Sequence, residues 1–241
     1  MVNPLTRKLE RYVRFSDADR IWLAEALVPI RTIPARSDII QEGDDPRAVN
    51  VILDGWAHRY RQFRDGRRQI VSILLPGDVC DPHIFLLDRM DHALGTITPV
   101  TLAQISGRAL QDLTARSSMI DEALMREVLA TAAVQREWTV CLGRRSAIER
   151  LAHLFCELHA RLDGIGLADA TGCPFPLLQS DLADALGQTP VHINRTLQDL
   201  RSMGLISLSK RRLTIHDRAG LAEFAEFDPT YLHFTVERDR A

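Results

Sequence analysis

Thiol and imidazole groups that could bind haem or a metal occur at scattered positions of the 241-residue chain. Cys80 and His83 lie close together, and sulfur and imidazole are ligands that suit haem iron or a transition metal. Cys173, if exposed, is a candidate redox switch. Because the four cysteines show no C-x-x-C spacing, we expect no metal site, no disulfide framework and no cofactor. The candidate effector or redox residues are Cys80, His83, His92 and Cys173.

The same cysteines and histidines leave an alternative function open, in which the chain is a metal- or haem-binding β-barrel sensor or a cupin-like enzyme. A cupin site needs histidines clustered at strand spacing with a carboxylate. His58, His83 and His92 are isolated singles. We therefore expect that the chain is not an enzyme, and we assign no catalytic residue.

Two helices with a polar face are predicted near the C-terminus. A short helix, Ser180–Leu186, stops at Gly187, and a second helix begins with Thr189 as its cap and Pro190 at its first position. Two helices joined by a tight glycine turn form a helix-turn-helix, whose second helix enters the major groove. The apolar side of that helix is predicted to carry Ile193, Leu197 and Leu200, and the opposite side Val191, Arg195, Gln198 and Ser202.

Arg195 is the strongest candidate for reading a base, because its planar fork matches the edge of a guanine. The segment after this helix predicts a β-hairpin with a basic tip, and the unit is then a winged helix. Such a tip contacts phosphates or is simply a solvated loop. The candidate DNA-contacting residues are Gln179, Ser180, Thr189, Pro190, Val191, His192, Asn194, Arg195, Gln198, Lys210, Arg211 and Arg212.

The elements that precede this unit change in kind along the chain. A capping box, Ser16 and Asp19, predicts a helix over Asp17–Leu27. Short β-type runs separated by glycine turns then fill residues 31–105 and favour a β-roll or barrel. The runs are Val49–Leu53, Trp56–Arg61, Gln69–Leu75 and Val100–Ile105.

Two longer helices connect the β region to the C-terminal unit. Residues 117–142 contain no glycine or proline, and apolar residues such as Ile120, Leu124 and Trp138 form a seam along them. We expect this seam to pack against a second copy of the chain, with packing inside its own chain as the alternative. A second helix is predicted over Ser146–Leu162.

Composition sets broad limits on function. Charged residues make up 26% of the chain, the formal charge is −2, and hydrophobic residues make up 46%, as in a folded globular protein. This charge neither supports nor excludes binding to DNA. With no signal-like segment and no apolar run long enough for a bilayer, we expect a cytoplasmic protein without membrane contact.

Several local motifs are spread along the chain, namely Gln41-Glu42-Gly43-Asp44, Ile52-Leu53-Asp54-Gly55, Leu75-Pro76-Gly77-Asp78, Asn194-Arg195-Thr196-Leu197 and Gly204-Leu205-Ile206. Together they resemble the Crp/Fnr family of bacterial transcription regulators. The resemblance implies a homodimer that binds a near-palindromic operator and contacts RNA polymerase, with a small-molecule effector as a further partner of unknown identity.

The fold class that we expect is α+β. It consists of a β-roll sensor of the cyclic-nucleotide-binding type in residues 1–116, a dimerisation helix in 117–143, and a winged helix-turn-helix in 144–241.

The chain also departs from the family. Cyclic-nucleotide-binding members hold the phosphate with an arginine, whereas the corresponding segments here read Asp81-Pro82 and His92-Ala93. We therefore expect that cyclic AMP does not bind at micromolar levels, and calorimetry tests this. No cysteine precedes Cys80, which argues against an N-terminal iron–sulfur cluster. Val191 replaces a glutamate of many relatives and offers only an apolar contact to a base.

Overall fold

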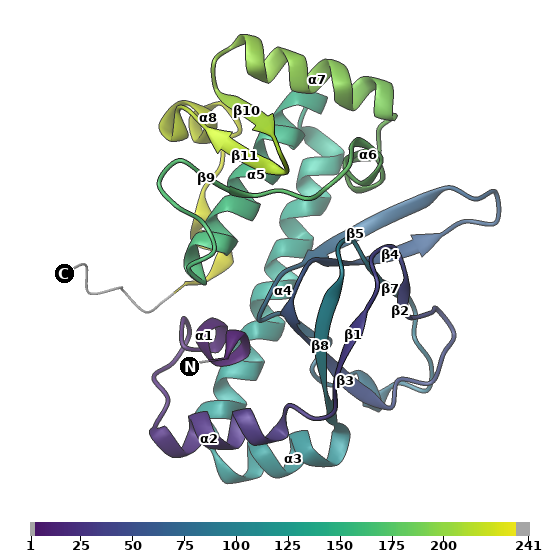
Figure 1. Ribbon diagram of the computed structural model, residues 1–241, viewed down its shortest axis with the longest axis vertical. Coiled ribbons are helices and arrows are strands. Elements are labelled where there is room, and N and C mark those ends of the chain that lie inside the picture. The colour runs from purple at the N-terminus through teal and green to yellow at the C-terminus, as the bar shows by residue number, and fades with distance from the viewer. Residues whose placement is uncertain (1–2, 235–241) are drawn as a thin grey trace. The chain divides into compact units, whose positions relative to one another are not determined.

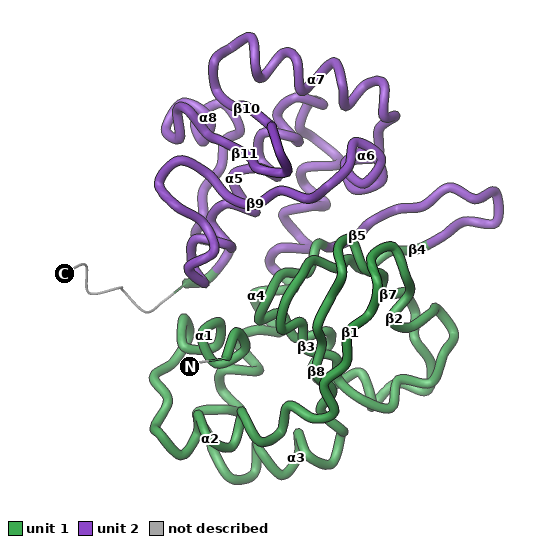
Figure 2. Tube along the Cα trace, viewed as in Figure 1, with its two compact units in different colours: residues 1–61, 73–132, 233–241 green, residues 62–72, 133–232 purple. Residues whose placement is uncertain are grey.

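The computed structural model describes residues 3–234, which fall into two compact units. Unit 1 comprises residues 1–61, 73–132 and 233–241, and unit 2 comprises residues 62–72 and 133–232 (Figure 2). The division predicted from sequence, with boundaries at 116 and 143, instead separates a sensor domain, a dimerisation helix and a winged helix-turn-helix. Residues 1–2 and 235–241 of that division lie outside the part of the chain that the structure describes.

Two antiparallel four-stranded sheets form the β-roll, whose residues belong to unit 1 except for residues 62–72 between β4 and β5 and in most of β5 (Figure 1). One sheet has the order β1-β8-β3-β6 and the other β2-β7-β4-β5. The strands are β1 Ile30–Ile33, β2 Asp38–Ile40, β3 Ala48–Asp54, β4 Ala57–Gln62, β5 Arg68–Leu74, β6 Val79–Cys80, β7 Ala93–Thr96 and β8 Val100–Ser106. The four strands predicted from sequence correspond to β3, β4, β5 and β8, and the sheets confirm a β-roll.

The core of unit 1 joins both sheets to several helices. Val49, Val51 and Leu102 are fully buried in it, together with Leu5 and Leu9 of the first helix. The helices are α1 Pro4–Leu9, α2 Asp17–Ala26, the short 3-10 turn η1 Ile84–Leu86 and α3 Gly107–Arg116. The predicted capping box at the start of α2 is present.

Gly55 makes the tight connection between β3 and β4 possible. Its φ is 85°, and a Cβ atom there would lie 2.1 Å from the carbonyl oxygen of Pro99. A side chain at this position would therefore collide with the backbone, which explains why the turn uses glycine.

The long helix α4, Ser118–Arg144, begins in unit 1 and ends in unit 2. Ile120, Leu124 and Trp138 of the seam predicted from sequence are at most 7% exposed, so these three residues pack inside their own chain, as in the alternative. The meeting of this helix with a second copy stays a prediction. Exposed apolar residues lie elsewhere on the helix, at Met125, Leu129 and Val140.

Unit 2 contains the predicted winged helix-turn-helix. Its helices are α5 Ala147–Gly164, α6 Gln179–Leu186, α7 Pro190–Ser202, α8 Arg218–Phe224 and the 3-10 turn η2 Pro229–Leu232. Its antiparallel sheet has the order β10-β11-β9, with β9 Gly172–Pro174, β10 Ile206–Ser209 and β11 Arg212–Ile215. Within residues 3–234, no helix has the length and apolarity needed to cross a bilayer.

Candidate DNA-binding site

Helices α6 and α7 are joined by the turn that the sequence predicts. Gly187 caps α6 in the left-handed region, with φ 64° and ψ 41°. The Thr189 hydroxyl accepts a hydrogen bond from the backbone N–H of His192 at 3.2 Å, and Pro190 occupies the first turn of α7. These local preferences fix where α7 begins and so which of its faces is presented outward.

Helix α7 has one buried and one exposed face. Ile193 and Leu200 are fully buried, whereas Val191 is 74% exposed. Arg195 and Gln198 are exposed on the same side as Val191. Within the described residues, the Arg195 guanidinium makes no hydrogen bond or ion pair with the protein, so all its donors can serve a ligand.

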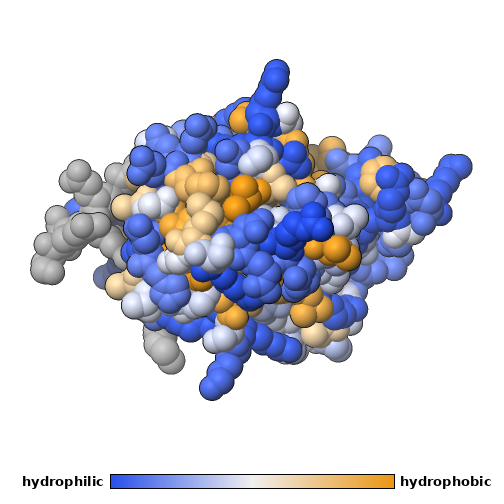
Figure 3. All heavy atoms as spheres, turned by 90° about the horizontal axis from the view of Figure 1, so that it is seen from above, coloured by the Kyte–Doolittle hydropathy of each residue, from blue (hydrophilic) through white to orange (hydrophobic). Residues whose placement is uncertain are grey.

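Short polar side chains surround the start of α7. Gln179, Ser180, Thr189 and His192 are all exposed at the N-terminal ends of α6 and α7. The Asn194 amide donates to the Gln179 side-chain oxygen at 3.4 Å, so these two residues lie together. The surface that carries α7 is mostly hydrophilic, with apolar patches among the polar residues (Figure 3).

The wing is a tight hairpin between β10 and β11. Lys210 and Arg211 form its tip, with φ values of 49° and 58°, and both side chains are exposed. Arg212 differs from the prediction because it belongs to β11, where its guanidinium donates to Asp169 at 2.6 Å and to Thr171 at 3.2 Å. The basic tip of the hairpin therefore consists of Lys210 and Arg211, with Arg212 held beside β9.

Comparison with known proteins identifies both parts of the chain. The Crp-like helix-turn-helix domain matches residues 149–224, and the cyclic nucleotide-binding domain matches residues 30–117. Nitrogen fixation regulation protein FixK of Bradyrhizobium diazoefficiens is 30% identical over 191 residues, which is 78% of each chain. The chain belongs to the Crp/Fnr family of transcriptional regulators.

Other relatives agree with this assignment. Transcriptional activator protein FnrL of Cereibacter sphaeroides is 27% identical over 217 residues, or 88% of this chain and 86% of its own. The structure of FixK2 from Bradyrhizobium japonicum has the same fold, with a TM-score of 0.71 and 23% identity over 81% of this chain and 96% of that one. These relatives are transcriptional regulators, a class of proteins that are not enzymes.

In this Crp/Fnr chain, a charge cluster occupies the β-roll near the segment where the family holds a cyclic phosphate. Arg59 is 7% exposed and donates from Nε to Asp81 at 3.1 Å. Asp81 also lies 3.2 Å from Nε2 of His92. Burial raises the pKa of Asp81, but the nearby charges of Arg59 and His92 outweigh it and lower that pKa to about 2. Arg59 was not predicted as a site residue, because an arginine in an alternating strand is usually exposed.

The predicted effector and redox residues are distributed rather than clustered. Cys80 is buried on β6, and burial raises the pKa of its thiol to about 12. His83 packs edge-on against Phe85 with ring centroids 6.1 Å apart. Cys173 is fully buried on β9, and burial raises the pKa of its thiol to about 12. The premise of an exposed, oxidisable Cys173 was therefore wrong, since β9 packs into the core of unit 2.

A different cluster was missed by the sequence analysis. Glu137, Cys141 and His153 bring a carboxylate, a thiol and an imidazole together in unit 2. The only sequence signal is that Glu137 and Cys141 are four residues apart on a predicted helix and so share a face. The position of His153 against them depends on how α5 packs on α4, which spacing along the chain does not specify.

Proposed function

We propose that this Crp/Fnr regulator acts as a homodimer that places two copies of α7 in successive major grooves of a near-palindromic operator, about 34 Å apart. Arg195 reads a guanine edge, while Val191 and Gln198 contact neighbouring bases. Gln179, Ser180, Thr189 and Asn194 position the helix on the phosphates.

One observation carries this proposal, namely the exposed face of α7 with an Arg195 side chain that has no protein partner among the described residues. A long arginine held only for packing would snorkel along apolar surface or pair with an acid. The wing tip adds two exposed cations, Lys210 and Arg211, at a place suited to phosphate contact.

The partners in this proposal are double-stranded DNA, a second copy of the chain and RNA polymerase, in the cytoplasm. The β-roll is the part that would respond to a small-molecule effector. Asp81 places a carboxylate near the position of the phosphate-binding arginine of other members, which supports an effector other than a cyclic nucleotide.

Genome-wide recovery of DNA bound to the tagged protein tests the proposal. We expect enriched fragments to share two inverted half-sites whose centres are one helical turn apart. Purified protein should bind that sequence much more tightly than a scrambled duplex of the same length and composition. The absence of a shared sequence, or equal binding to both duplexes, would contradict a sequence-specific role.

A further inference from the structure

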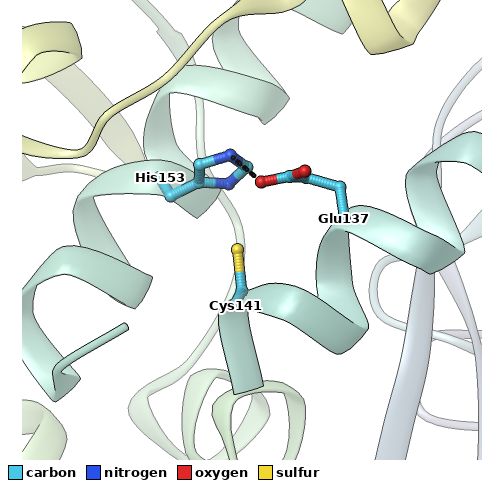
Figure 4. Close-up of side chains that lie close together, drawn as sticks. All are labelled: Glu137, Cys141 and His153. Carbon is cyan, nitrogen blue, oxygen red and sulfur yellow. Dashed lines mark ion pairs between the residues drawn. The ribbon is translucent and has the colours of Figure 1, made fainter. Parts of the chain in front are cut away.

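The cluster missed by the sequence analysis has the donor set of a metal site. Glu137 and Cys141 lie one turn apart on α4, and His153 lies on α5; their ligand atoms all fall within 4.8 Å of one another. Figure 4 shows the three side chains pointing toward one another from their helices. All three residues belong to unit 2.

His153 supplies an independent sign of a ligand. Its side chain is 2% exposed, and its Nε2 atom has no hydrogen-bond partner among the described residues, although it lies 3.3 Å from the Glu137 carboxylate. A buried imidazole nitrogen without a hydrogen-bond partner is costly, and coordination to a metal ion would satisfy it.

We propose that Glu137, Cys141 and His153 bind one borderline-soft divalent cation of the zinc class. Sulfur, imidazole and carboxylate are the three ligand types that proteins use for zinc, and three protein ligands leave a fourth position for water. In a tetrahedral site the donor atoms would approach to about 3.5 Å, a small adjustment from the present separations. Cys141 and His153 also line a small cavity with Trp138 and Leu186, which leaves space beside the donors.

Arg145 is the competing cation of this site. Its Nη1 atom donates to the Glu137 carboxylate at 2.6 Å and to the Cys141 sulfur at 2.8 Å. A metal ion must displace the guanidinium from both ligands because the two positive charges repel. Because a cysteine binds a metal ion as the thiolate, metal binding also releases the Cys141 thiol proton to solvent as the metal–sulfur bond forms.

The bound ion would tie the C-terminal half of α4 to α5 in place of the Arg145 contacts. Glu137, Cys141 and His153 belong neither to α7 nor to the wing. The proposed metal site therefore does not depend on the proposed DNA contacts.

Cobalt(II), a spectroscopic probe for zinc sites, tests the inference with the purified full-length chain in the absence of DNA. We expect one equivalent per chain to produce a thiolate-to-cobalt charge-transfer band in the near ultraviolet, and zinc to abolish it by displacement. Cys141→Ser should lose the band, and His153→Gln should weaken binding by more than about 100-fold. Cys173→Ser, which removes another buried thiol, is the matched control and should keep the band.

Arg145→Gln separates this site from adventitious binding. Removing the competing charge should tighten cobalt binding by about tenfold or more. Circular dichroism and thermal unfolding establish that each variant is folded, and metal should raise the unfolding temperature of the wild type but not of Cys141→Ser. Absence of the band in the folded wild type, or its persistence in Cys141→Ser, would overturn the proposal and leave the DNA-binding function untouched.

Discussion

Arg195 carries the largest share of the proposed base recognition, because it is the one cation in the centre of the exposed face of α7. Arg195→Ala should weaken operator binding by about 1–3 kcal/mol and relax specificity at one base pair. Fluorescence anisotropy with the recovered operator at fixed salt measures this loss. Arg116→Ala, which removes an exposed arginine at the end of α3, is the control. Unchanged operator affinity in Arg195→Ala would show that this face of α7 does not enter the groove.

His92 should make the stability of the β-roll depend on pH. Burial lowers the pKa of His92, but the nearby carboxylates of Asp81 and Asp91 outweigh it and raise that pKa above 6.5. The folded state thus holds the proton more tightly, so the added stability is present below pH 6.5 and is lost as pH rises through the raised value.

Urea unfolding at about pH 6 and about pH 8.5 tests this dependence. The wild type should lose more unfolding free energy between the two values than His92→Gln does. His216→Gln, which removes an exposed histidine of unit 2, should behave as the wild type. An identical pH dependence in wild type and His92→Gln would contradict a stabilising Asp81–His92 pair.

At the scale of elements, α5 is fixed in unit 2 by a buried carboxylate. Glu157 is fully buried and accepts hydrogen bonds from Trp138 Nε1 at 3.0 Å, from the Tyr231 hydroxyl at 2.9 Å and from Arg161 at 3.2 Å. Burial raises the pKa of Glu157, although these three donors oppose that effect. The carboxylate thereby connects α5 to α4 and to η2 within the unit.

Glu157→Ala should lower the free energy of unfolding by about 3–5 kcal/mol, because it takes the acceptor from the half-buried Arg161 guanidinium and from two other donors. Thermal or urea unfolding measures the loss. Glu157→Gln keeps one acceptor oxygen and should lose less, while Glu122→Ala on the exposed side of α4 should cost under about 1 kcal/mol. A Glu157→Ala variant as stable as Glu122→Ala would mean that the carboxylate does not hold these elements together.

Elements with strong local signals could be predicted from the sequence, and those defined by distant contacts could not. The Ser16 cap, Gly187 and Thr189 each fix a helix end through the local backbone, so α2, α6 and α7 were placed to within a residue or two. The strand β6 is only two residues long and exists through its pairing with Asn50 and Val51 of β3. No local pattern specifies such a strand.

In the candidate site, too, the features set by local sequence could be predicted and those set by distant contacts could not. The exposed side of α7 could be predicted because helical periodicity determines it once the buried side is known. By contrast, Arg212 is withdrawn from the wing tip by Asp169, a residue far away in sequence. The Glu137–Cys141–His153 cluster likewise depends on the packing of α5 against α4.

At the scale of the whole molecule, the proposed dimer needs a surface, and α4 offers one that differs from the predicted seam. Met125, Leu129 and Val140 are 49%, 58% and 49% exposed. At about 100° per residue these positions fall within one narrow arc of the helix, together with Ala132 and Arg136. An exposed apolar stripe on a long helix is the type of surface that packs against a copy of itself.

Leu129→Asp tests this dimer surface. In a twofold interface each aspartate would lie close to its own copy, so repulsion and desolvation should separate the chains. Light scattering should then give a mass near the 27.2 kDa of one chain, against about twice that for the wild type. Leu86→Asp, which changes a leucine that is 70% exposed outside α4, is the matched control and should remain dimeric.

The monomeric variant should also separate dimerisation from base recognition. A single α7 can occupy only one half-site, so operator affinity should fall by about 10²–10⁴-fold through loss of the second contact alone. Affinity for a duplex with one half-site should stay as it is in the wild type, since Arg195 and its neighbours are unchanged. If Leu129→Asp stays dimeric and binds the full operator normally, the two chains must meet through a surface other than the α4 stripe.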